Sequence, residues 1–370
     1  MMERILALAQ KEFMQIRRDP VLLRLVLLLP VVLLILFGYA LNTSLKNIPL
    51  GVVDHAQDRV SRILLDQFKN ENRFALVPAT TLDAALEAVK NGETHGILEV
   101  QHGALQAMRD NKPVEFTLRI DGSDPQITAQ IRAQASAAMQ DFTKKALAGR
   151  ALTENISAPV EPTFETLYNP DNRTAVFMVP GIVGLILAQI TTLLTSIGVV
   201  REREVGTLES LIATPIRPGE VILGKMLPYF VLGLVDAALI LVLGHWVFGV
   251  PLVGSVWLIA LAAFLFVLVS QGIGILISSV ARTQVQAMFG SFAILFPSIF
   301  LSGMLFPIQG MNTFFQTLSY AVPLRYFLDI MRAVMLRGTG FESLWVPFTC
   351  LGVFALLMVT LASLRFRKTL

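Results

Sequence analysis

The chain has 370 residues, of which 54% are hydrophobic and only 15% are charged, and its formal net charge is +3. Soluble globular proteins average about 25% charged residues, so this composition excludes an ordinary soluble protein. A net charge this small gives no support to nucleic-acid binding. The single cysteine, Cys350, excludes an intrachain disulfide.

The first segment, residues 1–20, reads as an amphipathic helix that ends at Pro20 and lies along the cytoplasmic face of a membrane. The next segment, residues 21–41, is apolar except for Arg24, which lies one turn inside its start and can snorkel to the interface. A spanning helix needs roughly 20 mostly apolar residues, so this run is the first predicted crossing.

More than half of the charged residues fall in residues 42–173, which form a polar island in an apolar chain. Strand-like and helix-like patterns alternate there, which predicts an α/β domain. We expect residues 149–173 to be an extended return toward the membrane. The predicted strands are 48–54, 73–78, 95–100 and 114–120, and the predicted helices are 58–69, 82–90 and 125–147.

The rest of the chain contains further apolar runs of spanning length. The predicted crossings are 174–200, 220–248, 255–281, 283–306 and 343–364, with a cytoplasmic loop at 201–219, an outer re-entrant or amphipathic region at 307–342 and a cytoplasmic tail at 365–370. The predicted fold is an α-helical polytopic membrane protein with about six transmembrane helices. Its α/β extracytoplasmic domain is inserted between helices 1 and 2.

Lysine and arginine in the short loops predict the orientation, because cytoplasmic loops carry an excess of both. They precede the first crossing, follow the last, and lie between the second and third, so both termini are predicted to be cytoplasmic. Arg325, Arg332 and Arg337 disagree, because this topology places them outside. We expect them to lie on an amphipathic or re-entrant helix instead of a free loop.

No motif in the sequence predicts catalysis, a bound cofactor or a metal site. Gly219 to Lys225 imitates part of a phosphate-binding loop, but Met226 stands where Ser or Thr would hold Mg²⁺. The four histidines have no metal-binding spacing. We therefore expect a chain that is not itself an enzyme.

The cytoplasmic loop contains a short helix with one apolar face, which is typical of a segment that docks into a groove on a soluble partner. Its start is highly charged, and its end is marked by Thr214-Pro215. The predicted docking residues are Arg201, Glu202, Glu204, Gly206, Thr207, Leu208, Glu209, Leu211, Ile212, Thr214 and Pro215.

This loop resembles the cytoplasmic signature of ABC-2-type exporter permeases, in which an R-E-R-E-x-G-T-L-E-x-L run precedes T-P and a later G-K. Lys11-Glu12 with Arg17 to Pro20 is similar to the entry helix of that family, and Ser302 to Pro307 is similar to its outer re-entrant region. The large inserted domain resembles the multidrug-type branch that includes the Ybh and Yhh permeases.

The resemblance implies a non-catalytic permease in the bacterial inner membrane, surrounded by membrane lipid. ATP and Mg²⁺ would be bound by a separate cytoplasmic ABC ATPase, and a second permease chain, identical or paralogous, would stand beside the first. A periplasmic adaptor is a further partner that the family admits. The implied cargo is hydrophobic or amphipathic, either drug-like compounds or lipids.

Three polar residues within the predicted crossings are candidates for the substrate path, namely Asp236, Gln189 and Gln271. Burying a charged residue in a membrane is expensive, so we expect Asp236 to face the protein interior or a dimer cavity. Two alternative functions remain open from the residues alone. One is an ion-coupled secondary transporter, and the other is a membrane receptor with an extracytoplasmic sensing domain.

Overall fold

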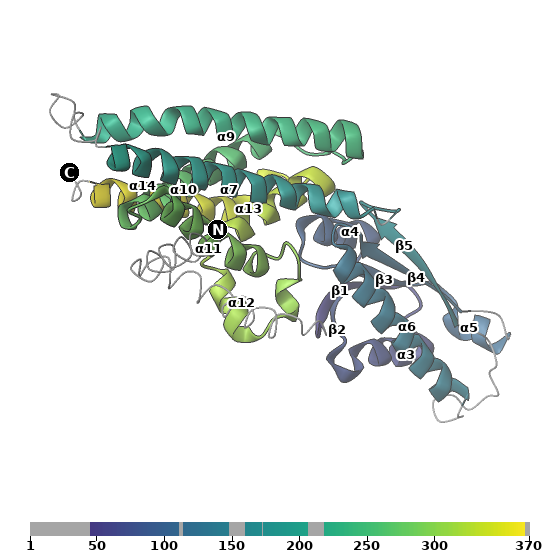
Figure 1. The fold of residues 1–370 in the computed structure, drawn as a ribbon. Helices are drawn as coiled ribbons and strands as arrows, with labels where there is room; N and C mark the ends of the chain where they lie inside the picture. Colours follow the sequence, from purple (N-terminus) through teal and green to yellow (C-terminus); the bar gives the residue numbers. More distant parts are fainter. Residues whose placement is uncertain (1–44, 111–113, 148–159, 172, 206–217, 367–370) are drawn as a thin grey trace, which may run out of the picture.

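The computed structural model describes residues 45–110, 114–147, 160–171, 173–205 and 218–366. An α/β domain lies at one end of a bundle of long helices (Figure 1). The predicted entry helix at 1–20 and the first predicted crossing at 21–41 lie outside the described residues.

The α/β domain is built on one five-stranded sheet with the order β2-β1-β3-β4-β5. β3 and β4 are antiparallel, and the other neighbouring pairs are parallel. β1 and β3 are almost entirely buried, as expected for strands covered on both faces. The strands are β1 (Ile48–Asp54), β2 (Phe74–Pro78), β3 (Gly96–Val100), β4 (Val114–Asp121) and β5 (Val160–Leu167).

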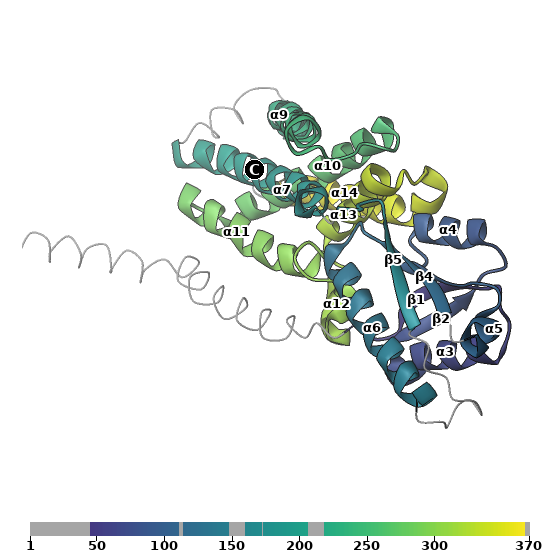
Figure 2. The same ribbon diagram turned by 90° about the vertical axis from the view of Figure 1, so that its right-hand side faces the viewer.

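Helices cover both faces of this sheet (Figure 2). α3 (Arg59–Lys69) and α6 (Pro125–Leu147) pack their buried apolar side chains against one face. α4 (Leu82–Asn91) packs against the other face, where Ala85 and Val89 contact the sheet. The short helices η1 (Asn70–Asn72) and α5 (Ala104–Arg109) lie in the connections.

The predicted strands and helices of this domain are confirmed to within a few residues. η1 and α5 were not predicted, and the segment expected to return to the membrane as extended chain contributes β5. β5 pairs with β4 over eight positions from Val114↔Val160 to Asp121↔Leu167. The chain therefore completes the sheet before it enters the bundle.

Five helices within the described residues are long and apolar enough to cross a membrane. The protein is thus a polytopic helical membrane protein. These helices are α7 (Thr174–Val205), α9 (Pro218–Phe248), α10 (Val256–Val280), α11 (Gln284–Leu301) and α14 (Phe341–Phe366).

Shorter helices connect α11 to α14 at the end of the bundle next to the α/β domain. The longest of them, α13, is amphipathic and packs against α7, α10 and α14. These shorter elements are η2 (Ile308–Gly310), α12 (Thr313–Ser319), α13 (Pro323–Arg332) and the π-helical turn η3 (Ala333–Arg337).

α10 is the central helix of the bundle and packs most extensively against α7 and α14. Two glycines allow these close approaches. A Cβ built on Gly272 would lie 2.9 Å from the backbone carbon of Met358 in α14, and one on Gly274 would lie 2.8 Å from the carbonyl oxygen of Thr192 in α7. Small residues at helix contacts are the usual means of close packing within membranes.

Candidate functional site

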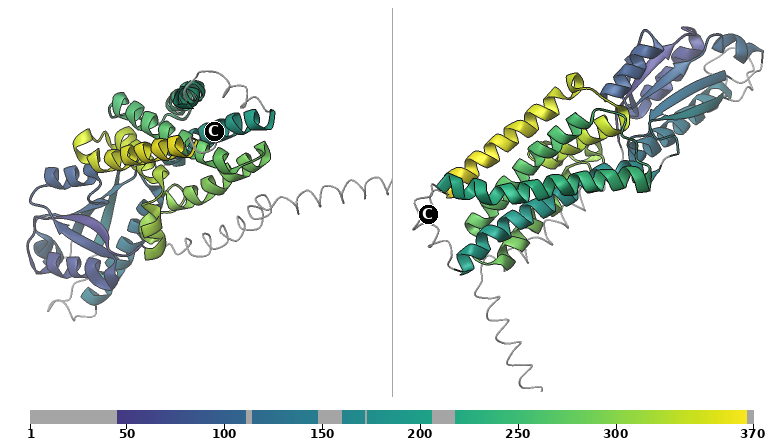
Figure 3. Two further views of the ribbon diagram at one scale, coloured as in Figure 1. Left: turned by 90° about the vertical axis from the view of Figure 1, so that its left-hand side faces the viewer. Right: turned by 90° about the horizontal axis from the view of Figure 1, so that it is seen from above.

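The bundle has one end next to the α/β domain and one end opposite it (Figure 3). The end next to the α/β domain carries all three tryptophans of the chain, and each is exposed on the surface of the bundle: Trp246 (82%), Trp257 (84%) and Trp345 (59%). We call it the tryptophan end. The opposite end carries Arg201, Arg203, Arg282 and Arg365, and we call it the arginine end.

At the arginine end, the last turns of α7 are fastened to the turn between α10 and α11. Arg203 Nη1 donates to the carbonyl oxygens of Ser278 and Ala281, both at 3.3 Å. The carboxylate of Glu204 accepts hydrogen bonds from the backbone nitrogen of Gln284 at 3.0 Å and from its side-chain Nε2 at 2.6 Å. These contacts join three helices into one unit at this end.

The predicted docking segment begins in this unit. Arg201, Glu202 and Glu204 lie in the last turns of α7, and Arg201 and Glu204 are exposed. The end of α7 at Val205 and the start of α9 at Pro218 both lie at the arginine end (Figures 1 and 3). The other docking residues, Gly206, Thr207, Leu208, Glu209, Leu211, Ile212, Thr214 and Pro215, lie outside the described residues.

The three candidate residues of the substrate path do not share one cavity in this structure. Gln189 lines a small cavity of about 40 Å³ between α7, α10 and α11, together with the hydroxyl-bearing Ser270 and Ser291. Gln271 is buried on α10, and Asp236 is half-buried on α9, and neither lines this cavity. Their role in transport stays a prediction.

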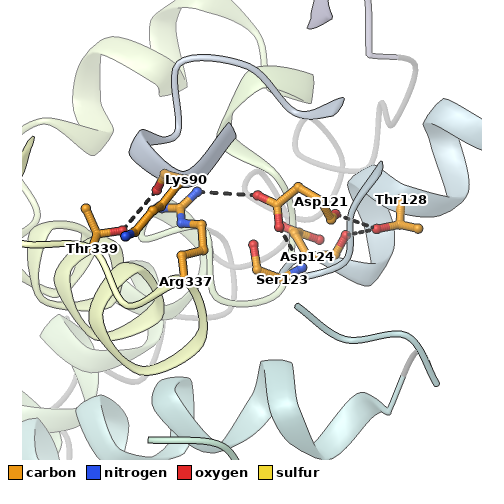
Figure 4. A network of polar contacts seen from close by, with 7 residues as sticks. All are labelled: Lys90, Asp121, Ser123, Asp124, Thr128, Arg337 and Thr339. Carbon is orange, nitrogen blue, oxygen red and sulfur yellow. Dashed lines mark hydrogen bonds and ion pairs between the residues drawn. The ribbon is translucent and has the colours of Figure 1, made fainter. Parts of the chain in front are cut away.

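The tryptophan end carries a second polar site that the sequence did not predict, where the α/β domain meets the bundle. Arg337 Nη1 lies 3.4 Å from Asp121 Oδ2, with both side chains largely buried. Thr339 Oγ1 donates to the carbonyl oxygen of Lys90 at 2.9 Å (Figure 4). Gln126 Nε2 donates to the carbonyl oxygen of Leu305. These contacts fix the domain to the bundle.

Local structure on both sides holds this ion pair in place. Asp121 ends β4, and its Oδ1 accepts from the backbone nitrogen of Ser123 at 2.9 Å. Thr128 Oγ1 donates to the Asp121 carbonyl oxygen at 2.9 Å and so ties the start of α6 to the strand end (Figure 4). Arg337 ends the π-helical turn η3, and Gly338 follows with φ +64°, a conformation that favours glycine. Short π-helical segments often mark functional sites.

A cavity of about 310 Å³ lies beside the ion pair, between the two parts of the molecule. Burial lowers the pKa of His95 on its α/β side, and burial also raises the pKa of Asp124 there. The α/β domain contributes Asn91, Gly92, His95, Asp121, Ser123, Asp124 and Ile127, and the bundle contributes Ser302, Gly303, Pro307, Ile308, Gln309, Asp329, Arg332, Arg337, Ser343, Leu344 and Pro347.

The arginines that conflicted with the predicted orientation belong to this region. Arg332 lies on α13 and Arg337 on η3, and both line the cavity. Arg325, also on α13, donates to Ser319 Oγ. Three cations with partners inside the protein are not free loop charges, so they carry little weight for orientation. The conflict itself was the one sequence signal that could have revealed this site.

A family model described as "ABC-2 family transporter protein" matches residues 21–364 of this chain. The chain belongs to the ABC-2 transporter family. The match covers the α/β domain as well as the helices, so both are parts of the ABC-2 permease unit. This protein is therefore a membrane permease subunit of an ABC exporter.

Similar proteins carry matching descriptions. A "Probable multidrug ABC transporter permease YbhS" of Escherichia coli is 28% identical, over 99% of this permease and 97% of the relative. The "Inner membrane transport permease YhhJ" of the same species is 29% identical over 88% and 87% of the two chains. "ABC transporter G family member 20" of Dictyostelium discoideum is 26% identical over 98% of this permease and half of the relative.

Proposed function

We propose that this ABC-2 permease exports hydrophobic or amphipathic small molecules across the bacterial inner membrane, driven by a cytoplasmic ABC ATPase that docks at residues 201–215. The observation that carries the proposal is the match to the ABC-2 family over residues 21–364. The multidrug description of the YbhS relative supports the cargo class. A second permease chain completes the transporter.

The orientation that fits this proposal has the arginine end in the cytoplasm and the α/β domain outside. Cytoplasmic ends of membrane helices are enriched in arginine and lysine, and tryptophan gathers at membrane surfaces. Arg201, Arg203, Arg282 and Arg365 support the first assignment. The three tryptophans support a bilayer surface next to the α/β domain.

The docking segment is well placed to move the bundle. It continues directly from the end of α7, which Arg203 and Glu204 fasten to the turn before α11. A displacement of this segment by ATP binding in the partner would therefore move α7, α10 and α11 together. This is how nucleotide binding would favour one arrangement of the bundle over another.

Pull-down of the partner ATPase tests the docking segment. Truncating a central apolar anchor of an interface typically costs more than about 1 kcal/mol, whereas a rim charge costs less. Leu211→Ala should therefore weaken co-purification more than Glu209→Ala does. Val77→Ala, which trims an apolar residue that is 46% exposed on β2 of the α/β domain, is the matched control and should bind normally.

A variant with Leu208, Leu211 and Ile212 all changed to Ser gives the decisive result. Undiminished ATPase binding by this variant at matched membrane expression would overturn the docking assignment. Retained binding without ATP-dependent export would instead place the defect in coupling.

The orientation has its own test in a Cys350→Ser background. A cysteine at Asp83, which is exposed on α4, should react with a membrane-impermeant thiol reagent in spheroplasts. A cysteine at Thr369 should react only after the membrane is opened. The reverse pattern would overturn the orientation without affecting the assignment to the family.

A further inference from the structure

The cavity between the α/β domain and the bundle lies at the tryptophan end of the bundle. It is lined by Ser302 and Gly303, which follow α11, and by Ser343 and Pro347 in the first turns of α14. The exposed Trp345 belongs to the same turns. Tryptophan marks the head-group region of a bilayer, whichever side of the membrane this end faces.

Two opposite charges on α13 line this cavity one helical turn apart. Asp329 and Arg332 stand at positions i and i+3, a spacing that ordinarily allows an ion pair. No ion pair joins them in the part of the chain that the structure describes. The reason is that Arg332 is held elsewhere: its Nη1 donates to the carbonyl oxygen of Gly303 at 3.0 Å, and its guanidinium lies 4.0 Å over the ring of Phe177.

This anchoring leaves one edge of the Arg332 guanidinium unused. Its Nε and Nη2 atoms are buried and have no hydrogen-bond partner among the described residues. A buried charged donor without a partner costs more than about 1 kcal/mol. The two N–H groups of one guanidinium edge match the two oxygens of a carboxylate or phosphate.

Asp329 offers the opposite charge in the same space. Its side chain is exposed while lining the cavity, and within the described residues it makes no hydrogen bond or ion pair. Two further acids on the cavity wall have partners, and one of them, Asp124, also interacts electrostatically with Arg332. Asp121 faces Arg337, and the Asp124 carboxylate accepts from the backbone nitrogens of Gln126 and Ile127.

We propose that this cavity binds a zwitterionic head group, with its acidic group on the free edge of Arg332 and its ammonium on Asp329. The volume of about 310 Å³ lies at the lower end of the range for ligand pockets and suits a head group rather than a whole amphiphile. The shared chemistry is an ammonium joined by a short linker to a phosphate or carboxylate. Its source is either a membrane phospholipid or a free solute.

Lipid binding to the purified full-length permease, measured by native mass spectrometry, tests the head-group chemistry. The probes are three lipids with identical dioleoyl chains, namely phosphatidylethanolamine, phosphatidylglycerol and a trimethylammonium lipid. The first carries both charges, the second carries only the acidic group, and the third carries only the cation. We expect the first to bind at least tenfold more tightly than the other two, because each unmatched charge costs about 1.4 kcal/mol or more. Equal binding of all three would overturn the proposal without any variant.

Variants then assign the two charges. Asp329→Asn should abolish the preference for phosphatidylethanolamine over phosphatidylglycerol, whereas Arg332→Gln should weaken both at least tenfold. Arg325→Gln is the matched control, since Arg325 lies on the same helix but stacks over Tyr320, outside the cavity. Each variant must elute and unfold like the parent. An equal loss of affinity with Arg325→Gln would contradict the assignment.

Competition by soluble O-phosphoethanolamine separates the two sources. Displacement of the lipid at millimolar concentration would identify a site that also accepts a free zwitterion. Tight lipid binding without displacement would identify a membrane lipid as the ligand. No binding of either probe would overturn the site, while leaving the exporter function untouched, because binding is measured without ATP or transport.

Discussion

Glu204, in the last turn of α7, caps α11 by accepting hydrogen bonds from both the backbone and the side chain of Gln284. The first N–H groups of a helix have no partner within the helix, and here the partner comes from a different membrane helix. Glu204 was predicted to contact the ATPase. That contact stays a prediction, and within the chain the Glu204 carboxylate joins the two helices.

Removing this cap should loosen the arginine end. Glu204→Ala should destabilise the permease by about 1 kcal/mol, the usual cost of losing a cap, and should reduce export more than ATPase binding. Thermal unfolding and pull-down measure the two effects. Glu87→Ala, at an exposed position of α4, is the control and should change neither. If Glu204→Ala lost as much ATPase binding as Leu211→Ala does, Glu204 would be a direct contact of the ATPase.

The close packing of α10 predicts strong effects from single methyl groups. Gly272→Ala and Gly274→Ala would each bring a Cβ against the backbone of a neighbouring helix, and such overpacking typically costs about 1–3 kcal/mol. Gly352→Ala in α14 meets nothing within 4 Å and should be neutral or slightly stabilising. Thermal unfolding in detergent compares the three variants. Equal melting temperatures would contradict the close contacts of α10 with α7 and α14.

The ion pair between the two parts of the molecule should be costly to break on one side. Arg337→Gln leaves the Asp121 carboxylate without its cation in a largely buried site, a type of change that costs up to about 3–5 kcal/mol. Limited proteolysis should then cleave the chain more readily in the region where the α/β domain contacts the bundle, beside Arg337. Arg62→Gln, at an exposed position of α3, should leave the digestion pattern unchanged.

His95 makes this contact region sensitive to acid. Burial lowers the pKa of His95 below its ordinary value, against the smaller opposing effect of Asp121. The unfolded chain then binds a proton near pH 6.5 when the folded chain does not, so stability falls as the pH drops below about 6.5. His95→Gln should flatten the melting temperature between pH 7 and pH 5.5. An unchanged slope would mean that other groups set the acid sensitivity.

The α/β elements could be predicted because their patterns are local. Alternating apolar residues in 48–54 and the helical spacing in 82–90 each required only a short window of sequence. β5 escaped this reasoning, because its place is set by pairing with β4, a contact between distant parts of the chain. The positions of the apolar helices could be predicted from length and composition, but α7 runs five residues beyond its predicted crossing and α11 ends five residues before the end of its own.

The site between the α/β domain and the bundle could not be predicted for the same reason. Asp121 and Arg337 lie far apart in the sequence, and neither belongs to a motif. Arg332 looked like a loop cation because charge counting ignores partners supplied by the fold. The docking segment, in contrast, was predicted from a motif, and the structure supplies only its first turn.

The placement of the three tryptophans has an optical consequence. Because Trp246, Trp257 and Trp345 lie at one end of the bundle and all are exposed, nearly all the intrinsic near-ultraviolet emission of the protein arises from a single depth. Brominated lipids labelled at successive acyl positions would therefore report that depth as one sharp quenching maximum. A spectral shift during turnover would record events at this surface only, with no signal from the arginine end.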